Sequence, residues 1–220
     1  MAANYTLVIG NKNFSSWSLR AWLAMKVAEI PFDEVAVRLY QPDTRARILP
    51  HSGAGRVPVL KIEESGSSRT VWDSLAICET LAELHPEARL WPVDAAARAH
   101  ARSMTAEMHS GFPDLRRQLS MDITARRPTP ALEEITRQQI ARVTELWTNA
   151  LSHSPNGGFL FGHFTIADAF YAPVVTRFAT YAIPLPAAAE KYCQRVKALV
   201  PMREWERAAG AEVQSAQTAN

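Results

Sequence analysis

The sequence predicts an α/β domain with a mixed sheet, followed by a domain that contains only helices. In residues 1–85, strand and helix patterns alternate in the order β-α-β, a loop, then β-β-α, which is typical of a layered α/β domain. Residues 86–93 contain two prolines and interrupt the pattern, as a linker does. In residues 94–220 the strand pattern nearly vanishes and helical periodicity remains. We therefore predict two domains joined by a short linker.

The elements of the first domain follow from hydrophobic periodicity. Short apolar or alternating runs predict strands at residues 5–9, 33–39, 57–62 and 69–72. Apolar residues at helical spacing predict helices at residues 18–29, 44–49 and 73–84. Two junctions between a strand and a helix therefore fall at the serine-rich residues 13–20 and at Asp73-Ser74.

The second domain begins with two long helical patterns. Residues 95–119 predict one helix with a kink at Pro113. Thr129 is expected to cap the next helix, with Pro130 in its first position, and this helix runs to about residue 151.

The C-terminal part of the second domain has one clear start signal. Thr165 and Asp168 are spaced as a capping box and open a helix through residue 180, in which both have a structural role. Further helices are predicted at residues 187–199 and 203–209. Residues 211–220 are small and polar, so we expect them to fray.

Composition and charge argue against several classes of function. The chain has 220 residues and a formal net charge of +2, which indicates no general attraction to nucleic acid or membranes. No apolar run approaches the roughly 20 residues that span a bilayer, and the N-terminus lacks the pattern of a secretory signal. The two cysteines, Cys78 and Cys193, form no CxxC pair, which fits a reducing cytosol and argues against a disulfide framework or a structural zinc site. We therefore expect a cytoplasmic protein without a metal.

The serine-rich stretch at residues 13–20 is the first candidate site, because it carries Ser15, Ser16 and Ser18 at a strand-to-helix junction. The first turn of a helix has free N–H donors, and the helix dipole favours negative charge there. Hydroxyls at such a point suit an anion such as a thiolate. Simple capping of the helix by Ser15 or Ser16 explains the pattern equally well.

Two further pairs of residues fall at element ends. Val57-Pro58 opens a predicted strand, and its proline is either a plain edge-strand proline, which the local sequence favours, or part of a cis bond that turns the backbone of Val57 toward a ligand. Asp73-Ser74 lies at the second junction, where either side chain can cap the helix. One α/β sheet brings all three places to one edge, where such sheets bind ligands. Their coincidence favours a single binding site.

With these motifs in this order, the whole chain resembles a cytosolic glutathione transferase. The residues that carry the resemblance are 14–20, 55–60, 73–77 and the capping box at 165–168. The resemblance implies a thioredoxin-like, glutathione-binding domain at residues 1–85 and an all-helical domain at residues 94–220 that lines the electrophile site. It also implies glutathione as the co-substrate and a homodimer as the assembly.

The resemblance assigns roles to the candidate residues. Ser15 or Ser16, with Ser15 preferred, would donate a hydrogen bond to the glutathione sulfur and lower the pKa of that thiol, which favours the reactive thiolate. Ser74 would hold the γ-glutamyl carboxylate and Asp73 the γ-glutamyl amine.

The same resemblance extends to four residues of the surrounding loops. Val57, before a cis Pro58, would pair its backbone with the cysteinyl part of glutathione. Arg56 would approach the glycyl carboxylate, and Trp17 would also contact glutathione. Trp17 stands where the Ser-Ser-Cys pattern of the zeta subgroup has cysteine, which argues against maleylacetoacetate isomerase activity.

The second substrate would lie between the domains. Its expected pocket is formed by Met104, Met108, His109 and Phe112, with Arg116 and Trp17 as further candidates. The helical spacing of the methionines and the phenylalanine fits a core position at least as well, and an isolated histidine is more commonly packed than catalytic.

These features together predict an enzyme that activates the glutathione thiol and conjugates it to small hydrophobic electrophiles. A glutathione-dependent isomerase or peroxidase would use the same glutathione site. A non-catalytic glutathione-binding module is the alternative from a different class. A thiol-disulfide oxidoreductase is disfavoured, because no cysteine stands at residues 15–18.

Overall fold

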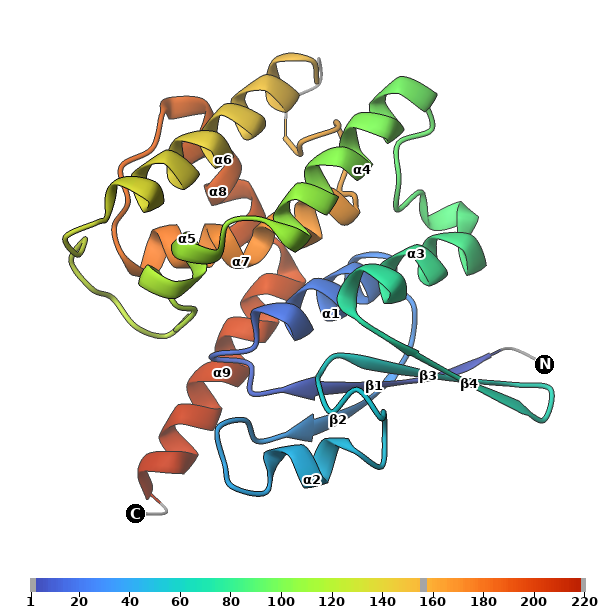
Figure 1. The fold of residues 1–220 in the computed structure, drawn as a ribbon. Helices are drawn as coiled ribbons and strands as arrows, with labels where there is room; N and C mark the ends of the chain where they lie inside the picture. Colours follow the sequence, from blue (N-terminus) through green and yellow to red (C-terminus); the bar gives the residue numbers. More distant parts are fainter. Residues whose placement is uncertain (1–2, 155–157, 219–220) are drawn as a thin grey trace.

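A four-stranded mixed sheet forms the base of the first domain in the computed structural model, which describes residues 3–154 and 158–218 (Figure 1). The strands are β1 (Asn4–Gly10), β2 (Asp33–Val37), β3 (Val59–Glu64) and β4 (Ser67–Trp72), in the order β2-β1-β3-β4. The pair β1 and β2 is parallel, and the other two pairs are antiparallel. The predicted mixed sheet is confirmed.

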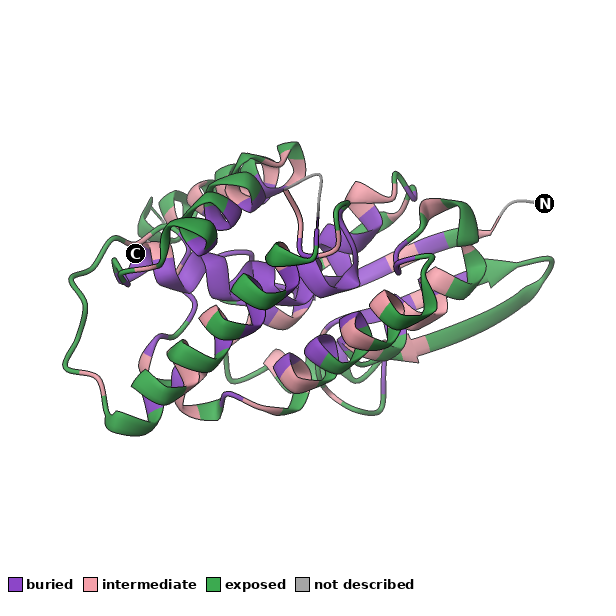
Figure 2. Cartoon of the chain, turned by 90° about the horizontal axis from the view of Figure 1, so that it is seen from above, coloured by how far each residue is buried: buried purple, intermediate pink, exposed green. Residues whose placement is uncertain are grey.

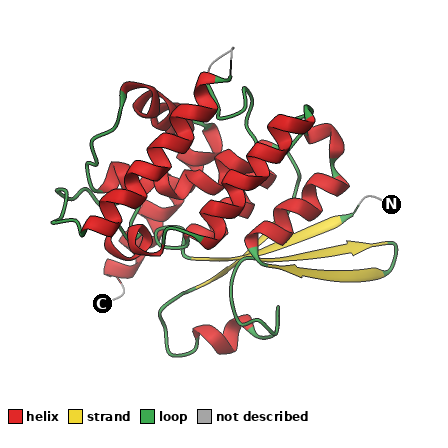
Figure 3. Cartoon of the chain, turned by 45° about the horizontal axis from the view of Figure 1, so that its top comes forward, coloured by secondary structure: helices red, strands yellow, loops and turns green. Residues whose placement is uncertain are grey.

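The alternation of side chains along β1 explains why both faces of the sheet are covered. Leu7 and Ile9 point to the face that carries α1 (Ser16–Val27) and α3 (Ser74–Leu84), and they join the main core. Val8 points to the opposite face and packs with Ile48 of α2 (Thr44–Ile48). The sheet thus holds the N-terminal ends of α1 and α3 on one side (Figure 3).

In the described part of the second domain every regular element is a helix, as the sequence predicts. The helices are α4 (Ala95–Ser110), α5 (Pro113–Gln118), α6 (Glu134–Ser152), α7 (Ile166–Thr180), α8 (Ala187–Ala198) and α9 (Val200–Thr218). A short 3-10 helix, Pro86–Ala88, lies between the two domains. Of the described residues, none belongs to a helix that is both long and apolar enough to cross a membrane.

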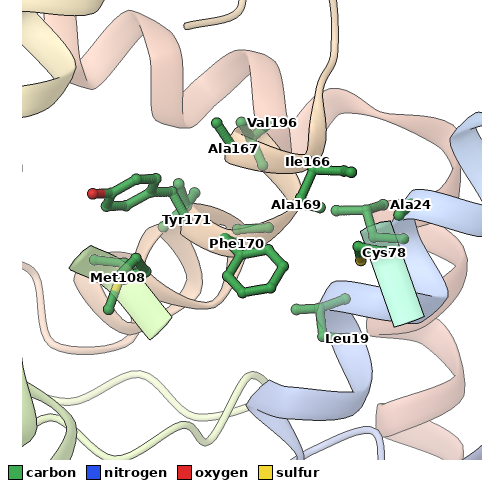
Figure 4. Packing of buried hydrophobic residues seen from close by; sticks show 14 of the residues in the cluster. Leu19, Ala24, Cys78, Met108, Ile166, Ala167, Ala169, Phe170, Tyr171 and Val196 are labelled. Atoms are coloured by element: carbon green, nitrogen blue, oxygen red, sulfur yellow. The ribbon is translucent and has the colours of Figure 1, made fainter. Parts of the chain in front are cut away.

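Helix α7 lies at the centre of the molecule and is buried on nearly all sides. It packs against α1 of the first domain and α4 of the second, so the two domains share one hydrophobic core. Figure 2 shows the buried residues concentrated along the middle of the molecule. Figure 4 shows Phe170 of α7 between Met108 on one side and Leu19 on the other.

The predicted long helix at residues 95–119 is wrong, because the chain breaks into α4 and α5. Gly111 is extended and Phe112 has a left-handed backbone, with φ of 57°. Pro113 explains the break: it has no N–H to continue the helical ladder, and it restricts the residue before it. The break turns α5 away from the line of α4 (Figure 1).

The predicted cap at Thr129 is also wrong. Helix α6 begins at Glu134, with Glu133 as its N-cap residue. The Thr129 hydroxyl instead donates hydrogen bonds to the carbonyl oxygens of Tyr181, at 2.8 Å, and Ala182, at 3.1 Å. A contact across 52 residues has replaced the local cap that the sequence suggested.

The C-terminal helix α9 is much longer than predicted and reaches Thr218, so the expected fraying from residue 211 is wrong over the described part of that segment. Two side chains tie it to the first domain. The indole N–H of Trp205 donates to the carbonyl of Lys12 at 2.7 Å, and the Lys12 N–H donates to Glu212 Oε2 at 2.8 Å. Trp205 also packs against Trp22 of α1, with ring centroids 5.0 Å apart.

The capping box of α7 is confirmed. Asp168 Oδ2 accepts the backbone N–H of Thr165 at 2.8 Å and its hydroxyl at 3.0 Å, and Oδ1 accepts the N–H of Leu160 at 3.1 Å. Burial raises the pKa of Asp168 to about 6, and these hydrogen bonds oppose the shift. The cap holds the start of α7 against the preceding loop.

Candidate functional site

Ser15 caps helix α1 and ties it to the end of β1. Its Oγ accepts the backbone N–H of Ser18 at 3.4 Å and donates to Ser18 Oγ at 2.7 Å. Ser18 Oγ in turn accepts the N–H of Gly10, the last residue of β1, at 3.0 Å. The capping interpretation of Ser15 is therefore correct, and its hydroxyl proton is directed at Ser18.

Ser16 is the first residue of α1, and its hydroxyl has no hydrogen-bond partner among the described residues. Ser15 and Ser16 both line a cavity of about 520 Å³, here called cavity 1. The other residues that line cavity 1 are Phe14, Trp17, Leu39, Tyr40, Thr44, Ile48, Gly55, Arg56, Val57, Arg116, Ser120, Met121 and Arg177. Cavity 1 thus joins the start of α1 to residues of the helical domain.

A neighbouring cavity of about 590 Å³, here called cavity 2, shares Trp17, Arg56 and Val57 with cavity 1. Its other lining residues are Arg45, Ala54, Pro58, Trp72, Asp73, Ser74 and His109. The structure therefore brings together all the residues that the sequence predicted to contact glutathione. The two cavities adjoin each other at the three residues that they share.

Asp73 and Ser74 place the N-terminus of α3 in cavity 2. Asp73 has a left-handed φ of 76° and caps α3, since its Oδ1 accepts the N–H groups of Leu75 at 2.8 Å and Ala76 at 3.3 Å. Ser74 is buried, and its Oγ has no hydrogen-bond partner among the described residues. A buried hydroxyl without a partner is costly, so Ser74 is suited to hold a polar ligand.

The Val57-Pro58 bond is cis, as the resemblance implied and against the edge-strand reading. Pro58 precedes β3 and is not part of it, and both residues line cavity 2. The nearby Gly55 has a φ of +61°, and a Cβ there would collide with Nη1 of Arg45. Glycine at this position therefore leaves room for the Arg45 side chain across the loop.

Arg45 was not predicted as a site residue, although it lines cavity 2 together with Arg56. Within the sequence it is one of two arginines in the short α2, and only the loop geometry distinguishes it from Arg47, which lies 3.9 Å from Asp43. The two arginines provide positive charge in cavity 2.

His109 lines cavity 2 and contacts its carboxylate. Its Nε2 lies 3.3 Å from Asp73 Oδ2, and its ring packs edge-on against Trp17 at 5.4 Å. Burial lowers the pKa of His109, although the nearby Asp73 opposes this shift. His109 therefore links the helical domain to the cap of α3 and does not belong to a separate electrophile pocket.

The expected electrophile pocket at Met104, Met108 and Phe112 is wrong, because these three side chains are buried in the core. Helix α4, which carries the two methionines, packs against α7, where the Tyr171 hydroxyl donates to the carbonyl of Met104 at 3.2 Å. The helical side of cavity 1 is lined instead by Arg116, Ser120, Met121 and Arg177. Arg177 lies one turn before the end of α7, where the sequence pattern indicated only a helix.

The two cysteines are unsuited to redox or nucleophilic chemistry. Cys78 and Cys193 are both buried and free. Burial raises the pKa of each thiol, that of Cys193 to about 12. Within residues 3–154 and 158–218, no group of three or more histidine, cysteine or acidic side chains is placed to hold a metal ion.

Two family models match the chain in sequence. Residues 14–84 match the N-terminal domain of glutathione S-transferases, and residues 95–208 match the C-terminal domain. The chain is 31% identical over 100 residues to a Caenorhabditis elegans protein named probable maleylacetoacetate isomerase, covering 46% of this chain and 44% of that one. It is 27% identical over 139 residues to mouse (Mus musculus) glutathione S-transferase omega-2, covering 63% and 53%. The chain thus spans about half the length of these curated relatives.

Solved structures agree over nearly the whole chain. A glutathione transferase homologue from Burkholderia, with bound glutathione, superimposes with a TM-score of 0.70 at 22% identity, covering 94% of this chain and 98% of that one. A maleylacetoacetate isomerase from Anaeromyxobacter dehalogenans, with glutathione in its active site, gives 0.68 at 25% identity, covering 93% and 95%.

Proposed function

Because this chain belongs to the glutathione S-transferase family, we propose that it is an enzyme that binds glutathione in cavity 2 and brings its thiol to the start of α1. The observation that carries the proposal is Ser74, which lines cavity 2 and whose buried hydroxyl has no partner among the described residues. The thiolate then attacks a small electrophile in cavity 1, where Ser16 lies.

The polar groups of cavity 2 match the functional groups of glutathione. The γ-glutamyl carboxylate accepts from the Ser74 hydroxyl at the positive end of α3, and its amine lies near the Asp73 carboxylate. The cysteinyl unit pairs with the backbone of Val57. The glycyl carboxylate lies toward Arg45 and Arg56. Each charged end of the tripeptide thereby meets a group of opposite charge or a helix N-terminus.

Ser16 is the residue that we propose to activate the thiol. Its hydroxyl is free to donate to the sulfur, whereas the Ser15 hydroxyl is engaged with Ser18. The N-terminus of α1 adds its dipole at the same point. Both effects stabilise the thiolate more than the thiol, so they lower the pKa of the bound thiol and raise the nucleophile concentration at neutral pH.

The test compares Ser16→Ala with Ser15→Ala in turnover of a chromogenic halonitrobenzene and in the pKa of bound glutathione. We expect Ser16→Ala to raise the thiol pKa by about 1 unit and to lower kcat about tenfold or more. Ser15→Ala is expected to cost about 1 kcal/mol of stability through loss of the cap, with a smaller effect on the thiol. If neither variant changes the thiol pKa, serine activation is wrong.

A glutathione-dependent isomerase is the second candidate, favoured by the similarity to two proteins named as maleylacetoacetate isomerases. The stoichiometry of glutathione separates the candidates, because an isomerase regenerates glutathione, a transferase consumes it, and a peroxidase converts it to its disulfide. Maleylacetoacetate, a halonitrobenzene and an organic hydroperoxide therefore form the substrate panel. Retention on glutathione-agarose without turnover of any of them would indicate a binding module.

The assembly and location remain part of the proposal. We propose a cytoplasmic homodimer with domains at residues 1–85 and 94–220 joined by a linker at residues 86–93. Trp72, at the end of the edge strand β4, is 56% exposed and is a candidate for the contact between subunits. Light scattering of the purified protein measures the mass, and a monomer mass would contradict the dimer.

A further inference from the structure

Several arginines gather around Trp17 and cavity 1. The guanidinium carbon of Arg20 lies 4.1 Å from the centre of the Trp17 ring, and that of Arg116 lies 5.6 Å from it. Arg177 adjoins Arg116, since its Nη1 donates to the Arg116 carbonyl at 3.3 Å. Arg56, Arg116 and Arg177 line the cavity itself. The start of α1 therefore faces a strongly positive wall.

None of these four arginines forms an ion pair with a carboxylate in the part of the chain that the structure describes. By contrast, the exposed Arg117, Arg127 and Arg142 each pair with an acidic side chain at 3.1 Å or less. Acidic partners are thus available on the surface but are excluded from cavity 1. The positive charge there is uncompensated.

Among these arginines, Arg20 is buried most completely and lacks acceptors for two of its nitrogens within the described chain. It is 1% exposed, between the rings of Trp17 and Phe170, and its Nε and Nη1 have no acceptor among the described residues. Burial, reinforced by the charges of Arg116 and Arg177, lowers the pKa of Arg20 to about 9. Burying a cation without a partner is unfavourable, so the buried Arg20 lowers the stability of the folded protein.

Arg177 and Arg116 both line cavity 1, where their guanidinium groups can contact a ligand. Arg177 is 5% exposed, and burial lowers its pKa to about 10. Its Nη1 is held by the carbonyl oxygens of Arg116 and Leu119, which fixes the orientation of the guanidinium. Burial also lowers the pKa of the half-buried Arg116, whose Nη1 makes only a 3.4 Å contact to the carbonyl of Met108. Both guanidinium groups therefore keep donors for an anion.

We propose that cavity 1 binds an anionic second substrate, an electrophile that carries a carboxylate, and that Arg116 and Arg177 hold this carboxylate while Ser16 faces the thiolate. The inference rests on the function proposed above and sharpens its substrate class. In the proposed complex the glycyl carboxylate of glutathione lies toward Arg56, so a neutral electrophile would leave Arg116 and Arg177 as the cavity 1 arginines without a carboxylate partner. A carboxylate supplies that counter-charge and accepts bidentate hydrogen bonds from a guanidinium.

The proposed role of the arginines in the reaction is to position the electrophile. In attack on a chloronitrobenzoate, the glutathione sulfur forms a bond to the ring carbon, the carbon–chlorine bond breaks, and chloride leaves with its electron pair. The proton of the thiol passes to solvent before the attack. Arg116 and Arg177 act by holding the carboxylate so that the reacting carbon faces the sulfur, and a neutral amide lacks the charge for this contact.

The test uses two electrophiles of the same shape, 4-chloro-3-nitrobenzoate and its neutral amide, 4-chloro-3-nitrobenzamide. Each kcat/KM is divided by the rate constant of the uncatalysed reaction with glutathione, which removes the difference in intrinsic reactivity. We expect this ratio to be at least about tenfold greater for the benzoate, which corresponds to about 1.4 kcal/mol. Equal ratios for the two compounds would overturn the proposal.

Arg116→Gln is the variant of choice, because Arg116 is half-buried and Arg177 of α7 contacts its backbone carbonyl, which the substitution retains. We expect it to abolish most of the preference for the benzoate while changing the benzamide ratio less than about threefold. Arg117→Gln is the matched control: it removes the same charge from the next residue of α5, which points away and pairs with Glu133. The proposal is wrong if Arg116→Gln lowers both ratios equally or if Arg117→Gln has the same effect.

A failure of the catalytic proposal gives a different result from a failure of this one. If neither electrophile is turned over faster than in solution, thiol activation is wrong, and the charge preference is then read from binding. Titration calorimetry with unreactive 3-nitrobenzoate and 3-nitrobenzamide, in the presence of glutathione, measures it directly. Tighter binding of the benzoate that is lost in Arg116→Gln supports the anion site, and equal affinities overturn it.

Discussion

At the scale of single residues, the two serines at the start of α1 have different hydrogen bonds, and the sequence alone does not say which hydroxyl is free. Ser15, which we preferred as the serine that contacts the thiol, caps α1. The neighbouring Ser16 has no hydrogen-bond partner for its hydroxyl among the described residues. The sequence indicates the start of α1 as a candidate site, because a helix cap and an anion-binding site share the same pattern of residues. It could not assign the hydroxyls, because that depends on Ser18, which accepts from both Ser15 and the end of β1.

Ser74 provides a prediction at the same scale. Ser74→Ala removes the buried hydroxyl that we assign to the γ-glutamyl carboxylate, so the dissociation constant of glutathione should rise about tenfold to a hundredfold. Because the hydroxyl has no protein partner among the described residues, the free energy of unfolding without ligand should hardly change. Calorimetry and chemical denaturation measure the two quantities. Ser68→Ala, on the exposed part of β4, is the control, and unchanged affinity in Ser74→Ala would refute the assignment.

The residues that line the helical side of cavity 1 could not be predicted from the sequence. Met104 and Met108 lie at helical spacing, and this pattern does not distinguish a core from a pocket. Arg177 lies in a helix that is buried on nearly all sides, and only the packing of α7 beneath the start of α1 brings it to cavity 1. Such residues are found only when the positions of the helices are known.

At the scale of elements, the strands and most helix starts were predictable from periodicity, whereas two helix ends were not. The apolar run of β1 and the capping box of α7 are local signals, so they can be recognised without knowing how the helices pack. The true length of α9 depends on contacts of Trp205 and Glu212 with Lys12, some 200 residues away. Long-range contacts of this kind leave no periodic trace in the sequence.

Asp168→Ala tests the cap of α7. The substitution leaves the N–H groups of Leu160 and Thr165 without their acceptor, so we expect the free energy of unfolding to fall by about 1–3 kcal/mol. Glutathione affinity of the folded protein should stay the same, because Asp168 lines neither cavity. A large loss of affinity at an unchanged melting temperature would show that the residue has a role in the site.

The raised pKa of Asp168 predicts a pH dependence of stability. Its folded pKa of about 6 lies above the ordinary value of 3.8, so the unfolded state releases this proton first as the pH rises. The stabilisation is complete below pH 3.8 and is lost as the pH passes through 6. Relative to Asp168→Asn, wild type should lose about 2–3 kcal/mol between pH 4 and pH 7. Denaturant titrations of both proteins at several pH values measure this difference, and a constant difference would contradict it.

At the scale of the whole molecule, one core joins the two domains, and the site lies where they meet. Phe170 of α7 touches Arg20 of α1, and His109 of α4 reaches Asp73 before α3. The thioredoxin-like domain supplies most of the groups that we propose for glutathione, and the helical domain supplies most of the charge of cavity 1. Neither domain contains the complete site.

The link from α9 to the first domain gives a prediction at this scale. Glu212→Ala leaves the Lys12 N–H without its acceptor, three residues before Ser15. We expect a loss of about 1–3 kcal/mol in the free energy of unfolding and a rise of the bound thiol pKa, because the loop that positions α1 is loosened. Glu206→Ala on the same helix is the control. Turnover and thiol pKa equal to wild type would mean that the loop is rigid without α9.

The attachment of α9 to Lys12 also bears on the order in which the contacts form during synthesis. Trp205 and Glu212 follow Lys12 in the chain by 193 and 200 residues, so they leave the ribosome after the whole first domain. The backbone groups of Lys12, in the loop before Ser15, therefore gain their two partners on α9 only after the first domain has been synthesised. A nascent chain that lacks α9 has the residues that we propose to bind glutathione, but not the contacts that hold the loop before α1.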